Sequence, residues 1–161
     1  KRHDVTPLLA ALDKATTAKC SYGLCTKRAG RQDFWNKKDT TDLQAGEFDL
    51  SAMTKTNVGA RYGQFSGAAV GSSSSQANPI LADTSADDRG GWYWIEVLPY
   101  DESSKNSGLI VDNTTGAATT SLLALNLRPS VAYRITALAY GRKPTTMVVL
   151  QQTYAQQRRK D

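Results

Sequence analysis

Apolar and polar residues alternate along three segments in the second half of the chain, at residues 92–98, 131–140 and 147–155. This period of two is typical of strands with one buried face. Gly141 and Pro144 lie in the short segment between the last two strands, which are therefore expected to form an antiparallel hairpin. The pattern predicts an antiparallel meander over residues 91–155.

The two faces of these strands differ in their side chains. In the first strand Tyr93, Ile95 and Val97 share one face, and the opposite face carries Trp92, Trp94, Glu96 and Leu98. In the second strand Val131, Tyr133, Ile135 and Ala137 alternate with polar residues. This alternation predicts that Arg134 faces solvent.

A stripe with helical spacing lies near the start of the chain. Its residues, at i, i+3 or i+4 spacing, are Leu8, Leu9, Leu12 and Ala15. Pro7 suits a first turn, and Thr6 or Asp4 can cap it. The stripe predicts a helix over residues 5–19 that lies on the sheet, because so short a helix is not stable alone. A helix followed by consecutive strands indicates an α+β domain.

The connection from residue 20 to residue 90 is expected to be mostly irregular. Phe34 and Trp35 are the large apolar side chains of its polar stretch, residues 26–41. We expect them to pack on the core, the alternative being an exposed binding surface. Residues 62–65 are a candidate short strand or an extended segment that enters a turn, and the serine run at residues 72–75 is a low-complexity loop.

A second long connection, residues 100–130, is rich in Ser, Thr, Asn and Gly. Loops of that length in a compact domain are usually functional or mobile. Its apolar island at residues 122–125 is either an added strand or a half-turn over the sheet edge. We therefore consider this loop a candidate interaction site, with Tyr100, Asp101, Glu102, Lys105, Leu122 and Leu123 as its candidate residues.

The length and net charge of the chain limit the number of domains and the class of partner. A chain of 161 residues is expected to form one domain. The net charge of +5 favours acidic partners only weakly. Its basic clusters, residues 1–2, 27–28 and 158–160, are interpreted as solvated. No run of 18 apolar residues and no signal-peptide pattern is present, so membrane insertion is not predicted from these residues.

Cys20 and Cys25 are the two cysteines, and His3 is the one histidine. Their spacing differs from that of zinc knuckles and of thioredoxin-type redox centres. A local disulfide in an oxidising compartment is the preferred interpretation, and two reduced cytosolic cysteines are the alternative. Closing so small a loop stabilises a fold by about 2 kcal/mol in the chain-entropy model.

No catalytic motif is recognisable in the sequence, and we expect neither enzymatic activity nor a cofactor. Asp83, Asp87 and Asp88 depart from calcium-loop spacing and are interpreted as a solvated acidic loop. Glu96 and Asp101 carry no specific signal as a carboxylate pair.

Aromatic and basic residues are interleaved near the strands, a combination that nucleic-acid-binding proteins use. Trp92 and Trp94 share one face, and Arg134 and Arg142 lie on or after the next strand. The preferred interpretation is that one of these tryptophans is buried. The alternative is that bases stack on this face.

Several segments, in this order, resemble the globular domain of PilX-type minor pilins of type IV pili. They are the Cys-x4-Cys unit with Trp35 downstream, residues 61–68, Tyr93 to Glu96, Tyr133 to Thr136 with Gly141, and residues 148–151 with Tyr154. Together they cover most of residues 20–155. The expected organisation is the end of an N-terminal helix (residues 4–19), a disulfide loop and connection (20–90) and a sheet (91–155).

The resemblance implies a non-enzymatic subunit that joins other minor pilins in a complex that primes pilus growth and sits at the fibre tip. Implied partners are the major pilin and a PilY-type tip adhesin. A hydrophobic helix before residue 4 would anchor the subunit in the inner membrane, facing the periplasm, before assembly into the extracellular fibre. Twitching motility and cell adhesion would follow from assembly. The alternatives are a minor pseudopilin of a type II secretion system, a DNA-binding module displayed on a pilus, and a secreted hydrolase.

Overall fold

The computed structural model describes residues 5–37, 40–41, 43–68, 78–101, 109–111, 118–119, 131–143 and 145–155. Its helices are α1 (Thr6–Ala15), the 3-10 helix η1 (Phe34–Asn36) and α2 (Leu50–Met53). Its strands are β1 (Cys20–Ser21), β2 (Leu24–Thr26), β3 (Ala60–Arg61), β4 (Gly91–Asp101), β5 (Leu109–Val111), β6 (Ala118–Thr119), β7 (Val131–Tyr140) and β8 (Met147–Tyr154).

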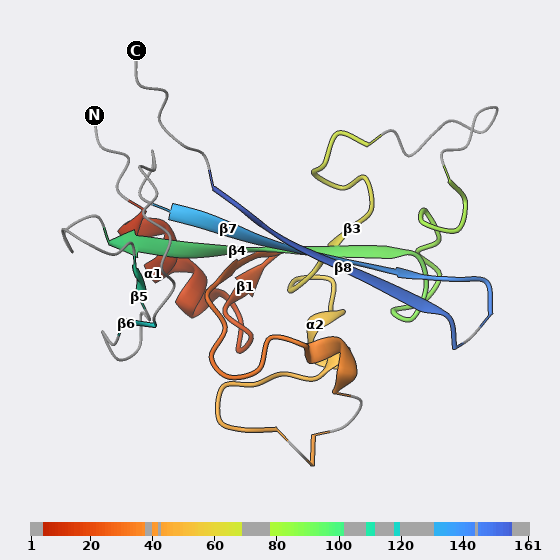
Figure 1. Ribbon diagram of the computed structural model, residues 1–161. Coiled ribbons are helices and arrows are strands. Elements are labelled where there is room, and N and C mark those ends of the chain that lie inside the picture. The colour runs from red at the N-terminus through yellow and green to blue at the C-terminus, as the bar shows by residue number, and fades with distance from the viewer. Residues whose placement is uncertain are drawn as a thin grey trace.

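The long strand β4 is the centre of the sheet (Figure 1). It pairs with β7 in antiparallel register from Gly91–Ala139 to Pro99–Val131, and β7 pairs with β8 in the same way. The predicted hairpin is therefore confirmed; Pro144 in its turn lies outside the described residues. On its other side β4 pairs antiparallel with β3 and parallel with β2.

Within residues 91–155 the described strands pair antiparallel, as predicted, but β2 adds a parallel pair, so the sheet as a whole is mixed and not a purely antiparallel meander. Parallel neighbours need a crossover of a dozen or more residues. The connection between β2 and β4 is long enough to supply one. The sequence predicted that connection as irregular, but it did not indicate that β2 returns to the sheet beside β4. The α+β class remains consistent with the structure, with α1 and α2 beside a mixed sheet.

Helix α1 is shorter than the predicted span, and only part of its stripe is buried. Pro7 lies in the first turn as predicted, whereas Thr6 is already helical and the cap residue Val5 makes no side-chain cap hydrogen bond. Asp4 lies outside the described residues. Leu9 and Leu12 are buried, but Leu8 and Ala15 are exposed.

Helix α1 ends where Thr16 adopts an extended backbone. The Thr16 hydroxyl donates to the Cys20 carbonyl at 2.8 Å and accepts from the Cys20 N–H at 3.1 Å. These two bonds satisfy backbone groups of the first cysteine. They explain why the helix stops before Lys19, since Thr16 holds the start of the following hairpin instead.

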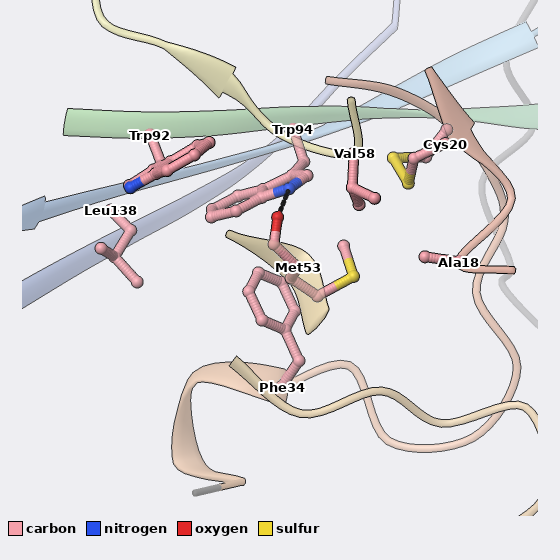
Figure 2. Packing of buried hydrophobic residues seen from close by; sticks show 9 residues of the cluster. Ala18, Cys20, Phe34, Met53, Val58, Trp92, Trp94 and Leu138 are labelled. Atoms are coloured by element: carbon pink, nitrogen blue, oxygen red, sulfur yellow. Dashed lines mark hydrogen bonds between the residues drawn. A yellow bond between two sulfur atoms is a disulfide. The ribbon is translucent and has the colours of Figure 1, made fainter. Parts of the chain in front are cut away.

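The larger core lies between one face of the sheet and the connection after β2 (Figure 2). Trp94 is fully buried, its ring centroid is 4.9 Å from that of Phe34, and its indole N–H donates to the Met53 carbonyl at 3.1 Å. Trp35 is half-buried against the same cluster. The predicted packing of Phe34 and Trp35 on the core is therefore confirmed. The buried members are Ala18, Cys20, Cys25, Phe34, Met53, Val58, Trp92, Trp94 and Leu138.

A smaller core lies on the opposite face of the sheet, under α1. Leu9 packs with Val97 and Val131, and Tyr133 and Leu24 border this contact. Successive strand residues point to opposite faces, so α1 and the connection cover different sides of β4 and β7. The sheet is thus covered by α1 on one face, where β4 ends and β7 begins, and by the connection on the other face.

Buried carboxylates keep the irregular connection ordered. Glu47 accepts hydrogen bonds from the backbone N–H groups of Arg31, at 2.8 Å, and Gln44, at 3.1 Å. These bonds lower the pKa of the Glu47 carboxyl. Asp49 caps α2 by accepting from the Ala52 N–H at 3.0 Å. Such bonds replace the ladder hydrogen bonds that this segment lacks.

Two predictions for the loops have different outcomes. The short strand is β3, which ends at Arg61, and residues 62–66 form turns and bends, so the predicted strand at 62–65 was misplaced. In the 100–130 connection, β4 continues to Asp101 and pairs with β5, which pairs with β6. The serine run and the apolar island at 122–125 lie outside the described residues.

Candidate functional site

The structure joins Cys20 and Cys25 in a disulfide across the β1–β2 hairpin, as predicted. Its turn places Tyr22 at φ 45° and Gly23 at φ 87°, in the left-handed region that favours glycine. A Cβ atom added at Gly23 would lie 2.6 Å from the Cβ atom of Ala60. The hairpin therefore needs glycine at this position, and Tyr22 is held at its tip with half of its surface exposed.

Reduction of the disulfide, or replacement of both cysteines by serine, is expected to lower the free energy of unfolding by about 2 kcal/mol. The cross-link stabilises by restricting the unfolded chain, so the native spectrum should change little. Urea unfolding with and without reductant measures the difference. Intact mass of the non-reduced protein provides the control, and two free thiols there would refute the bridge.

A buried ionic cluster ties the connection after β2 to the sheet. The Glu96 carboxylate is fully buried and accepts four hydrogen bonds: from the Arg28 backbone N–H at 3.0 Å, the Arg28 guanidinium at 2.7 Å, and the Arg134 guanidinium at 2.7 and 2.8 Å. Arg134 also donates to the Gln32 side-chain oxygen. The three charged groups come from β4, β7 and the connection, so the cluster links parts that are far apart in sequence.

The cluster holds two cations and one anion away from water. The side chains of Arg28 and Arg134 are 5% and 16% exposed. Burial lowers the pKa of the Arg28 guanidinium, and the charge and hydrogen bond of Glu96 oppose this shift. Arg28 also lies over the Phe34 ring, 4.5 Å from its centroid. The predictions of a solvated cluster at residues 27–28 and a solvent-facing Arg134 were therefore wrong for both arginines.

Apolar side chains exposed on the last strand form the candidate assembly surface. We call this set the β8 surface; its members are Val148, Leu150 and Tyr154, which are 57%, 70% and 48% exposed. They lie on the face of the sheet that carries Tyr93, Ile95 and Tyr133, since β8 pairs through β7 with β4. Val148 and Leu150 are neighbours on this face, and contiguous exposed apolar side chains mark protein–protein contacts.

A second exposed apolar contact lies beside the disulfide hairpin. Tyr22 and Phe65 meet edge-on with ring centroids 6.4 Å apart, and Phe65 is 65% exposed. Because Tyr22 lies at the tip of the disulfide hairpin, this pair forms an exposed aromatic projection beside it.

Comparison with protein-family models gives one match, to the model described as type IV pilus assembly protein PilX C-term, over residues 21–156. That span is most of the chain and includes β2, β4, β7 and β8. The chain belongs to the PilX family. No curated protein and no solved structure matches it significantly. The resemblance inferred from the sequence is therefore confirmed at the level of the family.

Membership of the PilX family makes this chain a protein of type IV pilus assembly that interacts with other pilus components. A pilus-associated family, together with a disulfide, points to a periplasmic or pilus location. Within the described residues, no helix is long and apolar enough to cross a membrane.

The candidate nucleic-acid residues of this PilX chain are dispersed by the fold. Trp92 and Trp94 are both buried, so neither ring is free to stack with a base. The Arg134 guanidinium is paired with Glu96. Arg142 is exposed after β7, at a small pocket that also contains Asp83 and Tyr140. The structure thus does not bring the four residues together on one surface.

The candidate interaction loop is only partly described. Tyr100 and Asp101 end β4, where their backbones pair with Ile110 and Leu109 of β5. Glu102, Lys105, Leu122 and Leu123 lie outside the described residues. Their contribution to assembly stays a prediction.

Three of the acidic residues considered in the sequence analysis, Asp83, Asp87 and Glu96, have structural partners. Asp83 accepts two hydrogen bonds from Ser85, which lower the pKa of its carboxyl. Asp87 lies 3.6 Å from the guanidinium of Arg61. The carboxylate of Glu96 forms ion pairs with two arginines, and the side chain of Asp101 is not described. Across the described part of the chain no group of three or more metal-ligating side chains is found.

Sequence reasoning missed the ionic cluster and the β8 surface. A signal for the cluster was present, because Glu96 shares a strand face with two tryptophans and needs a cation if that face is buried. A signal for the β8 surface was the absence of charged residues from 147 to 155.

Proposed function

We propose that this PilX chain is a minor pilin, a structural and non-enzymatic subunit of the complex that primes pilus assembly and sits at the fibre tip. The observation that carries the proposal is the PilX match over residues 21–156 with helix α1 directly before it. In such a subunit the helix joins the fibre and the sheet displays the contact surfaces. The packing of α1 on one face of the sheet and of the connection after β2 on the other supports this arrangement.

Other minor pilins, the major pilin and a PilY-type tip adhesin are the proposed partners. Before assembly the subunit would be held in the inner membrane by a hydrophobic segment preceding α1 and would face the periplasm. Two features support a role in protein contacts: the β8 surface and the exposed aromatic pair formed by Tyr22 and Phe65. Neither needs a cofactor or a reacting group.

Mixing experiments test this function. The chain is combined at micromolar concentration with the soluble domains of the minor pilins encoded beside its gene, and complexes are measured by size-exclusion chromatography with light scattering. A complex of defined stoichiometry with the pilus subunits is the expected result. Binding only to pseudopilins of a secretion system would replace the pilus assignment, and binding to neither set would contradict the assembly role.

A further inference from the structure

Strand β8 is an edge strand without the usual protection against pairing. In the described part of the chain it pairs with β7 alone. Native proteins block such edges with lysine, proline, bulges or very short strands. β8 has eight residues, its register with β7 is continuous, and residues 147–155 contain no charged residue and no proline.

The ladder indicates which backbone groups of β8 point away from β7. The Gly141 N–H donates to the Thr146 carbonyl at 2.8 Å, so Gly141 and Thr146 form a hydrogen-bonded pair. Hydrogen-bonded pairs recur at every second residue of an antiparallel ladder. Along β8 the N–H and C=O groups directed outward, as a template for another strand, therefore belong to Met147, Val149, Gln151 and Thr153.

Side chains next to this edge offer an apolar contact as well. Val148 and Leu150 are mostly exposed on one face, and Met147 and Val149 are half-buried on the other. A strand that pairs with β8 would place its own side chains directly beside them. Main-chain hydrogen bonds and alternate apolar pockets are the two components of strand addition.

Charge distinguishes the possible occupants of the edge. Arg142 and Lys143 are exposed in the turn before β8. In an antiparallel pair of two β8 strands, these cations would lie beside the other copy's strand, and residues 147–155 contain no acidic side chain to pair with them. Charge complementarity therefore favours a partner strand with acidic residues over a second copy.

We infer that β8 binds an extended segment of another protein, added antiparallel as a further strand, with alternate apolar side chains and acidic residues at its C-terminal end. The acidic end meets Arg142 and Lys143. This inference rests on the proposed assembly function and identifies the chemistry of one partner.

The test uses an acetylated peptide of strand length in which valine and threonine alternate and two aspartates follow at the C-terminus. Amide hydrogen exchange, followed by NMR, is measured on this chain with and without the peptide. Protection of the outward N–H groups of Val149, Gln151 and Thr153 is expected. Replacing the aspartates by lysines should weaken binding markedly at low salt. Equal protection with both peptides would overturn the acidic specificity.

Two variants locate the interaction. Leu150→Lys places a charge on the edge and should weaken binding about tenfold or more. Thr153→Pro removes one outward N–H without removing a bond to β7. Thr17→Lys is the control for an added charge, since Thr17 is also exposed but lies outside β8, and it should bind normally.

Distinct outcomes separate this inference from the proposed function. If the peptide protects no residue of β8 and Leu150→Lys still assembles with the minor pilins, strand addition is overturned and the assembly role stands. If the wild-type chain assembles with no pilus subunit, the assembly role itself fails. Dimers of the chain alone that Leu150→Lys abolishes would assign the edge to a second copy and overturn the heterologous partner.

Discussion

Replacing Glu96 with alanine is expected to lower the free energy of unfolding by about 3–5 kcal/mol. The carboxylate is fully buried and neutralises two arginines, of which Arg28 is itself buried. Its removal leaves two positive charges facing each other in a medium that screens them poorly. Urea denaturation of the two proteins measures the difference. The two midpoints are compared directly only if the unfolding free energies depend on urea concentration with the same slope.

A surface ion pair provides the control for this prediction. Lys19 and Asp13 are 3.4 Å apart and their side chains are 44% and 38% exposed, so Asp13→Ala should hardly change the midpoint. The triple replacement of Arg28, Glu96 and Arg134 by apolar residues should recover most of the lost stability, because no unpaired charge remains. A small effect of Glu96→Ala would show that water reaches the cluster.

Trp94→Ala is expected to have the second large effect, lowering the free energy of unfolding by about 3–5 kcal/mol. The side chain is fully buried, contacts the Phe34 ring edge-on and donates its N–H to Met53. Its loss leaves a cavity between β4 and the connection and an unsatisfied carbonyl. Since a domain of this size is stable by about 5–15 kcal/mol, the variant should be close to unfolding at moderate temperature.

Phe65→Ala is the matched control for Trp94→Ala. Phe65 is also aromatic but is 65% exposed, so thermal unfolding of this variant should resemble that of the wild type. Comparable destabilisation by the two substitutions would mean that the core is not organised around Trp94.

Local patterns predicted the elements of the sheet well. The alternation in residues 92–98 and 131–140 identified β4 and β7, and the turn after Gly141 identified the hairpin with β8. The disulfide followed from two cysteines close in sequence. Each of these features depends on neighbouring residues, which a sequence displays directly.

Long-range pairing was less accessible to sequence reasoning. Strand β2 has three residues, and its parallel pairing with β4 depends on the path of the whole connection. The alternation of residues 131–137 predicts that Arg134 faces solvent, because the residues between the apolar ones of a half-buried strand are usually exposed. Arg134 instead pairs with Glu96, 38 positions away, and the pattern of its own strand does not show that its face is also covered. The buried face of β7 therefore carries Arg134, Thr136 and Leu138.

The central claim, that the chain is a minor subunit built into the pilus, is tested most directly by mass spectrometry of sheared, purified pili. Quantification relative to the major pilin, in the organism that carries the gene, gives the copy number per fibre. The account predicts that the chain is present at far fewer copies than the major pilin. Its absence from purified pili, while it accumulates in the periplasm, would contradict the account.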